Sequence, residues 1–183
     1  MGLYIVIGIV GVVALWVILT YNGLVSRRAM VAEGWSGIDA QLKRRADLIP
    51  NLVETVKGYA AHERTTFDEL ARLRSQGGSQ DPAQRAVSEQ AITAAIGKVM
   101  AVAEAYPELK ASANFQSLQK DLGDIEDQIQ LARRYYNGAV RNLNVSVQQF
   151  PSNLIANMTG FTAAQFFQLD NAAERNAPKV SFS

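Results

Sequence analysis

The stretch that decides the fold runs from Phe115 to Phe150 and reads FQSLQKDLGDIEDQIQLARRYYNGAVRNLNVSVQQF. An apolar residue recurs here every seven positions, with a second apolar or small residue three positions after most of them. The two series are Phe115, Leu122, Ile129, Tyr136, Leu143 and Phe150, and Leu118, Ile125, Ala132, Ala139 and Ser146. Alternating steps of three and four residues are typical of helices that pack with a left-handed twist. The sequence therefore predicts one long helix with a buried face, and Gly138 and Ala139 as a place where a neighbouring helix approaches closely.

Helical patterns separated by prolines make up most of the remaining chain. Pro82 follows a glycine-rich turn and Pro107 follows Tyr106, and both are expected to begin helices. Pro151 should end the long helix before it. No stretch alternates apolar and polar residues between turn signals as a strand does. We therefore predict an all-α fold, an antiparallel helical bundle with long helices.

The first helix of this bundle is expected to carry an apolar stripe with one charged residue in it. The stripe comprises Val31, Trp35, Ile38, Leu42, Ile49, Leu52, Val56 and Tyr59. Arg45 occupies the stripe position between Leu42 and Ile49. Either Arg45 reaches a buried carboxylate and fixes the register, or its stem packs while its guanidinium extends to water. We favour the second interpretation, because an unpaired buried charge costs several kcal/mol. Pro50 should kink this helix.

A helix from Pro82 to Ala105 and two short helices near the C-terminus complete the predicted set. The inward side of the first is expected to be Val87, Ala91, Ala94, Ala95, Val99 and Val102. The short helices span 153–158 and 163–169, with Gly160 just after the first and Thr162 as N-cap of the second. Their apolar residues are Leu154, Ile155, Met158, Phe161, Phe166 and Phe167. We interpret this cluster as a lid on the bundle end, with a partner groove as the alternative.

The N-terminal segment has the length and composition of a membrane anchor. Residues 2–19 read GLYIVIGIVGVVALWVIL and contain no charged side chain. As a helix they would reach about 27 Å, close to the hydrocarbon thickness of a bilayer. Trp16 and Tyr21 lie near the end of this segment, where interfacial aromatic residues are enriched. We predict one transmembrane helix in residues 1–22, nearly continuous with the first bundle helix.

Two other interpretations of this segment are less favoured. A cleaved signal peptide would need a basic start and small residues at a cut site, and residues 18–22 offer no such site. A buried core helix seldom runs so far without a charge. Arg27 and Arg28 follow the segment directly, so the excess of basic residues places the C-terminal side in the cytoplasm and the N-terminus outside. Trp16, Tyr21, Arg27 and Arg28 are therefore the candidate membrane-flank or interaction residues.

Composition excludes several classes of chemistry. The 183 residues include no cysteine and one histidine, so thiolate metal sites, disulfides and cysteine nucleophiles are absent. With 18 basic and 17 acidic residues the net charge is +1, which gives no reason to expect nucleic acid as a partner. His62-Glu63 is the one histidine–carboxylate pair, and no second histidine completes a metal motif. We identify no catalytic, cofactor-binding or metal-binding residues and expect no cofactor and no enzyme activity.

One carboxylate cluster and one glycine pair have residue types that also occur in metal and phosphate sites. Asp121, Asp124 and either Glu126 or Asp127 offer oxygen ligands for magnesium, but this spacing is more typical of a solvated helix face. Gly77-Gly78 lacks the lysine and the spacing of a phosphate loop. Neither observation favours a reaction.

Several blocks of the sequence resemble the LemA family of bacterial membrane proteins. They are YNGLV at 21–25, WSGID at 35–39, QLKRRADLIPNLV at 41–53, YPELK at 106–110, ARRYYN at 132–137 and FPSN at 150–153. The resemblance spans nearly the whole chain; Gly34 departs from it, since alanine is more usual there. It implies a single-pass anchor with a short external N-terminus and a cytoplasmic antiparallel bundle. It also implies no assigned enzymatic activity, and a relative in magnetosome-forming bacteria is associated with building an internal membrane compartment.

These observations lead to three functional hypotheses. The leading one is a single-pass membrane-anchored helical scaffold that binds protein partners or self-associates and organises or shapes the membrane. The second is a membrane-tethered sensor with a small ligand inside the bundle, which expects Arg45 to face a cavity with Tyr59 or Tyr136. The third is an enzyme of unfamiliar chemistry, which expects His62 in a pocket with carboxylates. We divide the chain into an anchor (1–22), a LemA-like bundle (23–170) and an extended or loose tail (171–183), at the bacterial inner or cell membrane.

Overall fold

The computed structural model describes residues 1–168, and every regular element in that range is a helix. The helices are α1 (Gly2–Lys57), α2 (Arg64–Gln76), α3 (Pro82–Glu104), α4 (Pro107–Lys110), α5 (Ala113–Gln148) and α6 (Ser152–Thr159). The prediction of an all-α fold is confirmed. The predicted tail at 171–183 lies outside the described residues.

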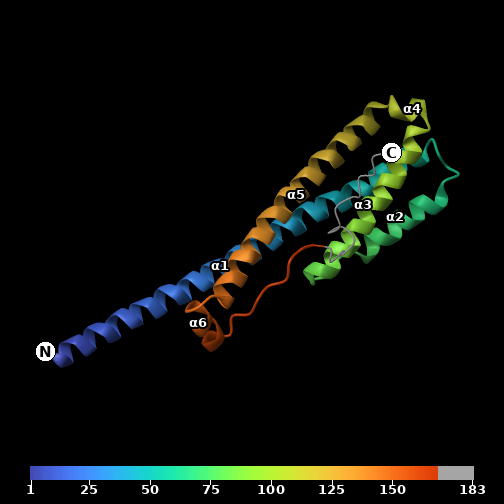
Figure 1. Cartoon of the computed structure of the whole chain (residues 1–183). Coiled ribbons are helices and arrows are strands. Elements are labelled where there is room, and N and C mark those ends of the chain that lie inside the picture. Colours follow the sequence, from blue (N-terminus) through green and yellow to red (C-terminus); the bar gives the residue numbers. More distant parts are fainter. Residues whose placement is uncertain (169–183) are drawn as a thin grey trace, which may run out of the picture.

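Helix α1 is a single rod that begins outside the bundle and ends inside it (Figure 1). Its 56 residues would extend for about 84 Å at the usual rise. The first turns are exposed on all sides, and buried residues begin at Leu24 and continue to Val56. The predicted long apolar N-terminal helix is therefore present, and it is continuous with the helix that lines the core.

Pro50 lies within α1 and does not end it. Proline has no N–H, so the carbonyl four residues earlier, that of Ala46, loses its helical donor. Arg74 of α2 supplies a replacement, because its Nε donates to the Ala46 carbonyl oxygen at 2.8 Å. Pro50 itself is exposed, so the interruption lies on the outer side of the helix. The proline thereby creates an acceptor by which α2 is attached to α1.

Helices α1 and α5 lie side by side and run in opposite directions (Figure 1). Glu33 of α1 meets Tyr135 of α5, whereas Arg45, further along α1, meets Glu126, earlier in α5. The closest backbone approach is at Gly34, where a Cβ would lie 3.0 Å from the Cα of Tyr136. The close approach predicted at Gly138 and Ala139 is wrong at Gly138, because a Cβ there would meet open space, whereas Ala139 is buried. Gly34, where the resemblance expects alanine, is thus the glycine at the close contact between α1 and α5.

The heptad face of α5 is buried as predicted along most of its length. Its buried residues include Phe115, Leu122, Ile125, Ile129, Tyr136, Ala139, Leu143 and Ser146. Phe150 lies beyond the end of α5 and is 74% exposed, which corrects its assignment to the seam. Helices α2 and α3 pack on each other and on α1, and α4 joins α3 to α5 at the far end (Figure 1). The inward face of α3 also differs from the prediction: Val87 is 59% exposed, while Arg85 and Glu89 are buried.

The chain after α6 is extended instead of helical, so the helix predicted at 163–169 is wrong over its described part. Two asparagines of α5 hold this segment. The side chain of Asn144 exchanges hydrogen bonds with the backbone of Ala164 at 2.8 and 2.9 Å. Asn137 does the same with Phe167 at 2.9 and 3.2 Å. These amides take the backbone groups that helical hydrogen bonds would need, so the segment stays extended.

Further contacts fix the same segment. The Tyr136 hydroxyl donates to the carbonyl of Gln165 at 2.8 Å. Burial raises the pKa of Tyr136 above its ordinary value, and the negative charge of Asp81 adds to this, so the hydroxyl keeps its proton and remains a donor. Before the segment, α6 ends as predicted at Gly160, which has a positive φ of 75°. Residues 161–168 therefore form a strap along α5 and α1.

We expect Asn144→Ala to destabilise the full chain by about 1–3 kcal/mol, because it removes two hydrogen bonds worth roughly 0.5–1.5 kcal/mol each. Asn142→Ala is the matched control, since Asn142 lies two residues away on α5 and is exposed. The measurement is the free energy of unfolding in detergent, followed by circular dichroism. Equal effects of the two substitutions would contradict the role of Asn144 as a clamp.

Candidate functional site

The most unusual group in the bundle is a buried arginine that bridges three helices. Arg45 of α1 is only 2% exposed. It forms ion pairs with the carboxylates of Glu89 on α3 and Glu126 on α5, the latter at 2.9 Å. It also donates to the hydroxyl of Thr93 at 2.7 Å. One guanidinium thus joins α1, α3 and α5 at the middle of the bundle.

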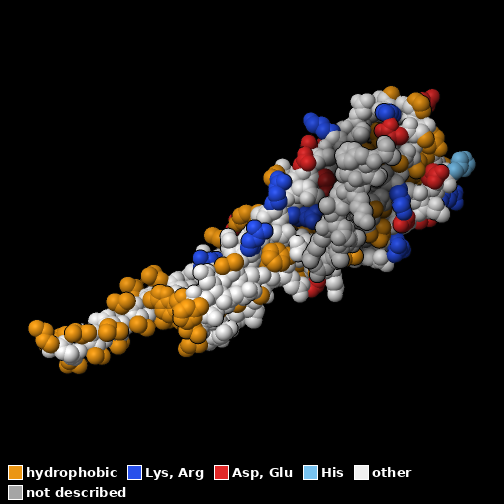
Figure 2. Space-filling view, in the orientation of Figure 1, with side chains coloured by type: hydrophobic (Ala, Val, Ile, Leu, Met, Phe, Trp, Pro, Cys, Tyr) orange, Lys and Arg blue, Asp and Glu red, His pale blue; other side chains and the backbone are white. Residues whose placement is uncertain are grey.

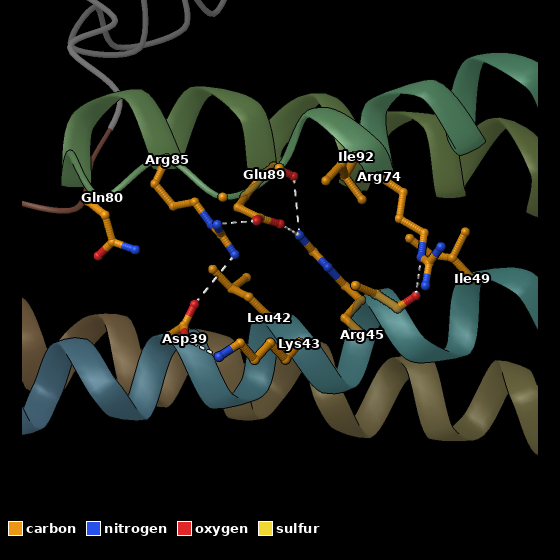
Figure 3. A pocket seen from close by; sticks show the side chains of 13 residues that line it. Asp39, Leu42, Lys43, Arg45, Ile49, Arg74, Gln80, Arg85, Glu89 and Ile92 are labelled. Carbon is orange, nitrogen blue, oxygen red and sulfur yellow. Dashed lines mark hydrogen bonds and ion pairs between the residues drawn. The ribbon is translucent and has the colours of Figure 1, made fainter.

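The network continues along the interface between α1 and α3 through a second arginine (Figure 3). Arg85 of α3 approaches the other oxygen of Glu89 through its Nε at 2.8 Å. Its Nη2 lies 3.6 Å from Asp39 of α1, which in turn pairs with Lys43 at 2.9 Å. Glu89 therefore lies between two guanidinium groups and is itself 7% exposed. We call Asp39, Arg45, Arg85, Glu89 and Glu126 the Arg45 network.

This arrangement corrects the interpretation of Arg45 as a residue whose charged end reaches water. Its guanidinium is buried and paired with two carboxylates. This is the other interpretation, in which Arg45 reaches a buried carboxylate. Two charges desolvated together are tolerated only when their hydrogen bonds are satisfied, as they are here on both Nη atoms. Arg45 therefore has no donor on either Nη atom left without a partner. The network fixes the register of three helices and offers no activated nucleophile.

A cavity of about 250 Å³ adjoins the network between α1, α3 and the glycine turn at 77–78. Its charged lining residues are Asp39, Lys43, Arg45, Arg74, Arg85 and Glu89. The sensor hypothesis expected Tyr59 or Tyr136 in such a cavity, and neither lines it. Tyr59 is 45% exposed, and Tyr136 packs against Trp35. The cavity exists, but the tyrosines lie elsewhere and Arg45 is engaged by protein groups.

The residues weighed for catalysis or metal binding do not come together in one site. His62 is exposed on the turn between α1 and α2. Glu126, considered earlier as a magnesium ligand, is the partner of Arg45 instead. Asp121 and Asp124 line a groove with Asp47, where Arg44 adds a positive charge. Among residues 1–168 no group of three or more acidic or histidine side chains is placed to hold a metal ion.

The four membrane-flank candidates lie at the opposite end of the bundle from α4 (Figure 1). Trp16 packs against a cluster formed by Leu24, Leu143, Ile155, Ala156 and Phe161. Tyr21 contacts Phe161 edge to face at 5.9 Å between ring centroids. The guanidinium of Arg28 lies 4.8 Å from the centre of the same ring. Arg27 instead folds back beside Gly23 and is exposed.

Phe161 thus contacts two of the four candidates, Tyr21 and Arg28, and belongs to the cluster against which Trp16 packs. The predicted lid contains Phe161 together with the other apolar residues of 154–167, but in the structure these residues lie in separate places. Ile155 and Phe161 are buried at the base of the bundle, whereas Phe167 packs against Trp35 higher up. Leu154 and Met158 are 51% and 83% exposed. We call the cluster of Leu24, Leu143, Ile155, Ala156 and Phe161 the basal cluster.

We expect Arg45→Met to destabilise the full chain by about 3–5 kcal/mol, because it leaves Glu89 and Glu126 buried or half-buried without this partner. Arg44→Met, the same change at the adjacent exposed position, should alter stability by no more than about 0.5 kcal/mol. The measurement is chemical unfolding in detergent. A loss below about 1 kcal/mol for Arg45→Met would mean that the network contributes no more than a surface ion pair.

Comparison with known proteins finds relatives that align over most of the chain. Magnetosome protein MamQ 2 of Paramagnetospirillum magneticum is 27% identical over 192 aligned positions, covering 89% of this chain and 71% of that protein. Magnetosome protein MamQ of Magnetospirillum gryphiswaldense is 24% identical, covering 82% and 65%. Protein LemA of Metamycoplasma hominis is 25% identical, covering 80% and 68%. The profile of the LemA family matches residues 34–182, so the chain belongs to the LemA family.

Proposed function

We propose that this protein is a single-pass membrane-anchored helical scaffold, with residues 1–22 in the bilayer and the bundle on its cytoplasmic side. The observation that carries the proposal is the state of the first turns of α1. Among the described residues, α1 is the helix that is long and apolar enough to cross a membrane. None of its most apolar 18 residues is buried against protein. An apolar helix with no protein around it needs lipid around it.

The packing of α1 supports retention of this segment over its removal as a signal. Trp16 and Val17, inside the apolar run, pack against the basal cluster. Leu24, seven residues after Val17, is 1% exposed and belongs to that cluster. Cleavage near residue 20 would remove side chains that cover the base of the bundle. Anchor and bundle are therefore one packing unit.

The scaffold role rests on what the bundle offers to other molecules. Its buried charges are paired with one another in the Arg45 network, which joins α1, α3 and α5. Anchoring confines such bodies to two dimensions and raises their effective concentration, so weak surface contacts suffice for assembly. Relatives named magnetosome proteins support membrane organisation as the process. We propose self-association or binding of protein partners as the activity.

The topology can be tested with single cysteines, because the chain has none of its own. Ser117→Cys lies exposed on α5, and a cysteine inserted between Met1 and Gly2 precedes the apolar run of α1. We expect a membrane-impermeant maleimide to label the inserted N-terminal cysteine on spheroplasts and to label Ser117→Cys only after lysis. The physical reason is the excess of basic residues after the span, which favours the cytoplasmic side. The reverse labelling pattern would contradict the proposed orientation.

The scaffold activity can be tested by proximity crosslinking in native membranes, followed by sizing of the detergent-extracted complex. We expect crosslinked species larger than one chain, with the same partners or copies in the extracted complex. Arg44→Met leaves the Arg45 network intact, so this variant serves as a folding-neutral control and should give the same crosslinked species as the unsubstituted chain. A strictly monomeric extract with no crosslinked partner would contradict the scaffold while leaving the anchor in place.

A further inference from the structure

Helix α6 is apolar on two sides, and only one of them is covered. Ile155 and Ala156 are buried in the basal cluster. On the other side, Leu154 is 51% exposed and Met158 is 83% exposed, and Phe150, just before the helix, is 74% exposed. These three residues are spaced four apart, which places Leu154 and Met158 on the same helical face. Large apolar side chains in a row are unusual on a water-facing surface.

The surroundings of this row carry no charge over an unusually long stretch. Between Arg141 and Asp170 the sequence contains no Asp, Glu, Lys, Arg or His. The segment of α1 beside it, up to Glu33, contributes only Arg27 and Arg28 as charged side chains. On the face drawn in Figure 2, the described part of the bundle away from α6 carries basic and acidic side chains together. The base is therefore uncharged except for two cations and carries exposed apolar side chains, a composition that suits the interface of a bilayer with anionic lipids.

The position of α6 along α1 is the decisive observation. The basal cluster, to which α6 contributes Ile155 and Ala156, packs against Trp16 and Val17 and includes Leu24. The apolar run ends at Leu19, so this contact region begins within the run and ends about 8 Å beyond it. The headgroup layer is about 5–8 Å thick on each side of the hydrocarbon. A helix packed at this level cannot stay in bulk water once the anchor is inserted.

We propose that α6 and Phe150 form a lipid-facing foot that lies in the cytoplasmic interface of the bilayer, with Phe150, Leu154 and Met158 directed into the boundary of the acyl chains. This proposal rests on the proposed anchoring of α1. The occupant of the exposed face is lipid because that face continues the apolar surface of the span, as the hydrophobic side chains near α6 and along α1 adjoin in Figure 2. Arg28, held over Phe161, is positioned to meet lipid phosphates.

A foot of this kind changes how the bundle is attached. A lone span can tilt and rotate, and its orientation is set by packing and interfacial anchors. A second contact at α6 fixes the rotation of α1 about its axis, because α6 packs on one side of it. The foot also inserts apolar volume into one leaflet, as interfacial helices do.

The test uses a depth-dependent quencher and the cysteine-free background of the chain. Full-length Met158→Cys, labelled with a nitrobenzoxadiazole dye, is reconstituted into vesicles of phosphatidylethanolamine and phosphatidylglycerol that contain spin-labelled lipids. Val12→Cys, within the span, reports insertion of the anchor, and Ser117→Cys, on the exposed part of α5, reports the solvated bundle. Circular dichroism of each variant verifies that the helices are retained.

We expect the Met158 label to lose fluorescence most strongly with a shallow nitroxide, the Val12 label with a deep one, and the Ser117 label with neither. Quenching at Val12 without quenching at Met158 would overturn the foot and leave the anchor standing. Absence of quenching at both positions would overturn the anchor, and the foot with it. A Met158 label that is shielded from water but not quenched, or disulfide crosslinking between Met158→Cys chains, would show that a second copy covers this face and would also overturn the proposal.

Discussion

In the proposed anchored state, the single continuous helix α1 meets lipid around its first turns and protein around its later ones, and the rest of the described fold is built on the later part. The first turns of α1 have no protein around them, whereas Ile38, Leu52 and Val56 have no exposed surface. A helix makes its backbone hydrogen bonds internally in either medium, so α1 can pass from one environment to the other with its backbone paired, apart from the Ala46 carbonyl, which Arg74 satisfies. The two parts of α1 differ in their side chains and in what surrounds them. The bundle therefore begins where its partners first cover α1, at Trp16 to Leu24, and α6 lies at that level.

Inside the bundle, polar side chains determine which surfaces meet. Apolar stripes with steps of three and four residues can slide past one another by a turn at modest cost, but a buried guanidinium cannot lose its carboxylates at modest cost. Arg45 contacts α3 and α5 at the same time, so one displaced helix would break pairs with the others. Arg74 also joins two helices near Pro50, where the proline leaves the Ala46 carbonyl without its helical donor and the Arg74 side chain supplies one.

The strap at 161–168 extends this use of polar side chains to a segment without helical hydrogen bonds. Asn137 and Asn144 are seven residues apart, so they lie on one face of α5 and reach Phe167 and Ala164 in turn. The strap places Phe161 at the base of the bundle, beside Tyr21 and Arg28. The proposed foot thereby depends on the clamps as well as on α6, since both hold the base against α1.

The sequence by itself determined the elements that depend on local pattern. The all-α class, the long α5 with its seam, the short helix ended by Gly160 and the apolar start of α1 follow from periodicity, capping and hydropathy. It also supplied the two alternatives for Arg45, but the choice between them depended on carboxylates 44 and 81 residues away. The predicted inward face of α3 is wrong at Val87, because the buried face of α3 includes Arg85 and Glu89, whose charges are paired inside the bundle.

Only the tertiary structure decided where polar groups are paired. Residues 163–168 have a helical pattern, yet they are extended because distant asparagines take their backbone groups. The close approach falls at Gly34 and not at Gly138, since contact depends on the partner helix and not on the glycine. The periodicity of apolar residues indicates which face of a helix is buried, but not which residues of another helix that face contacts. The partner of a buried charge or amide is set by distance in space, which a linear pattern does not contain.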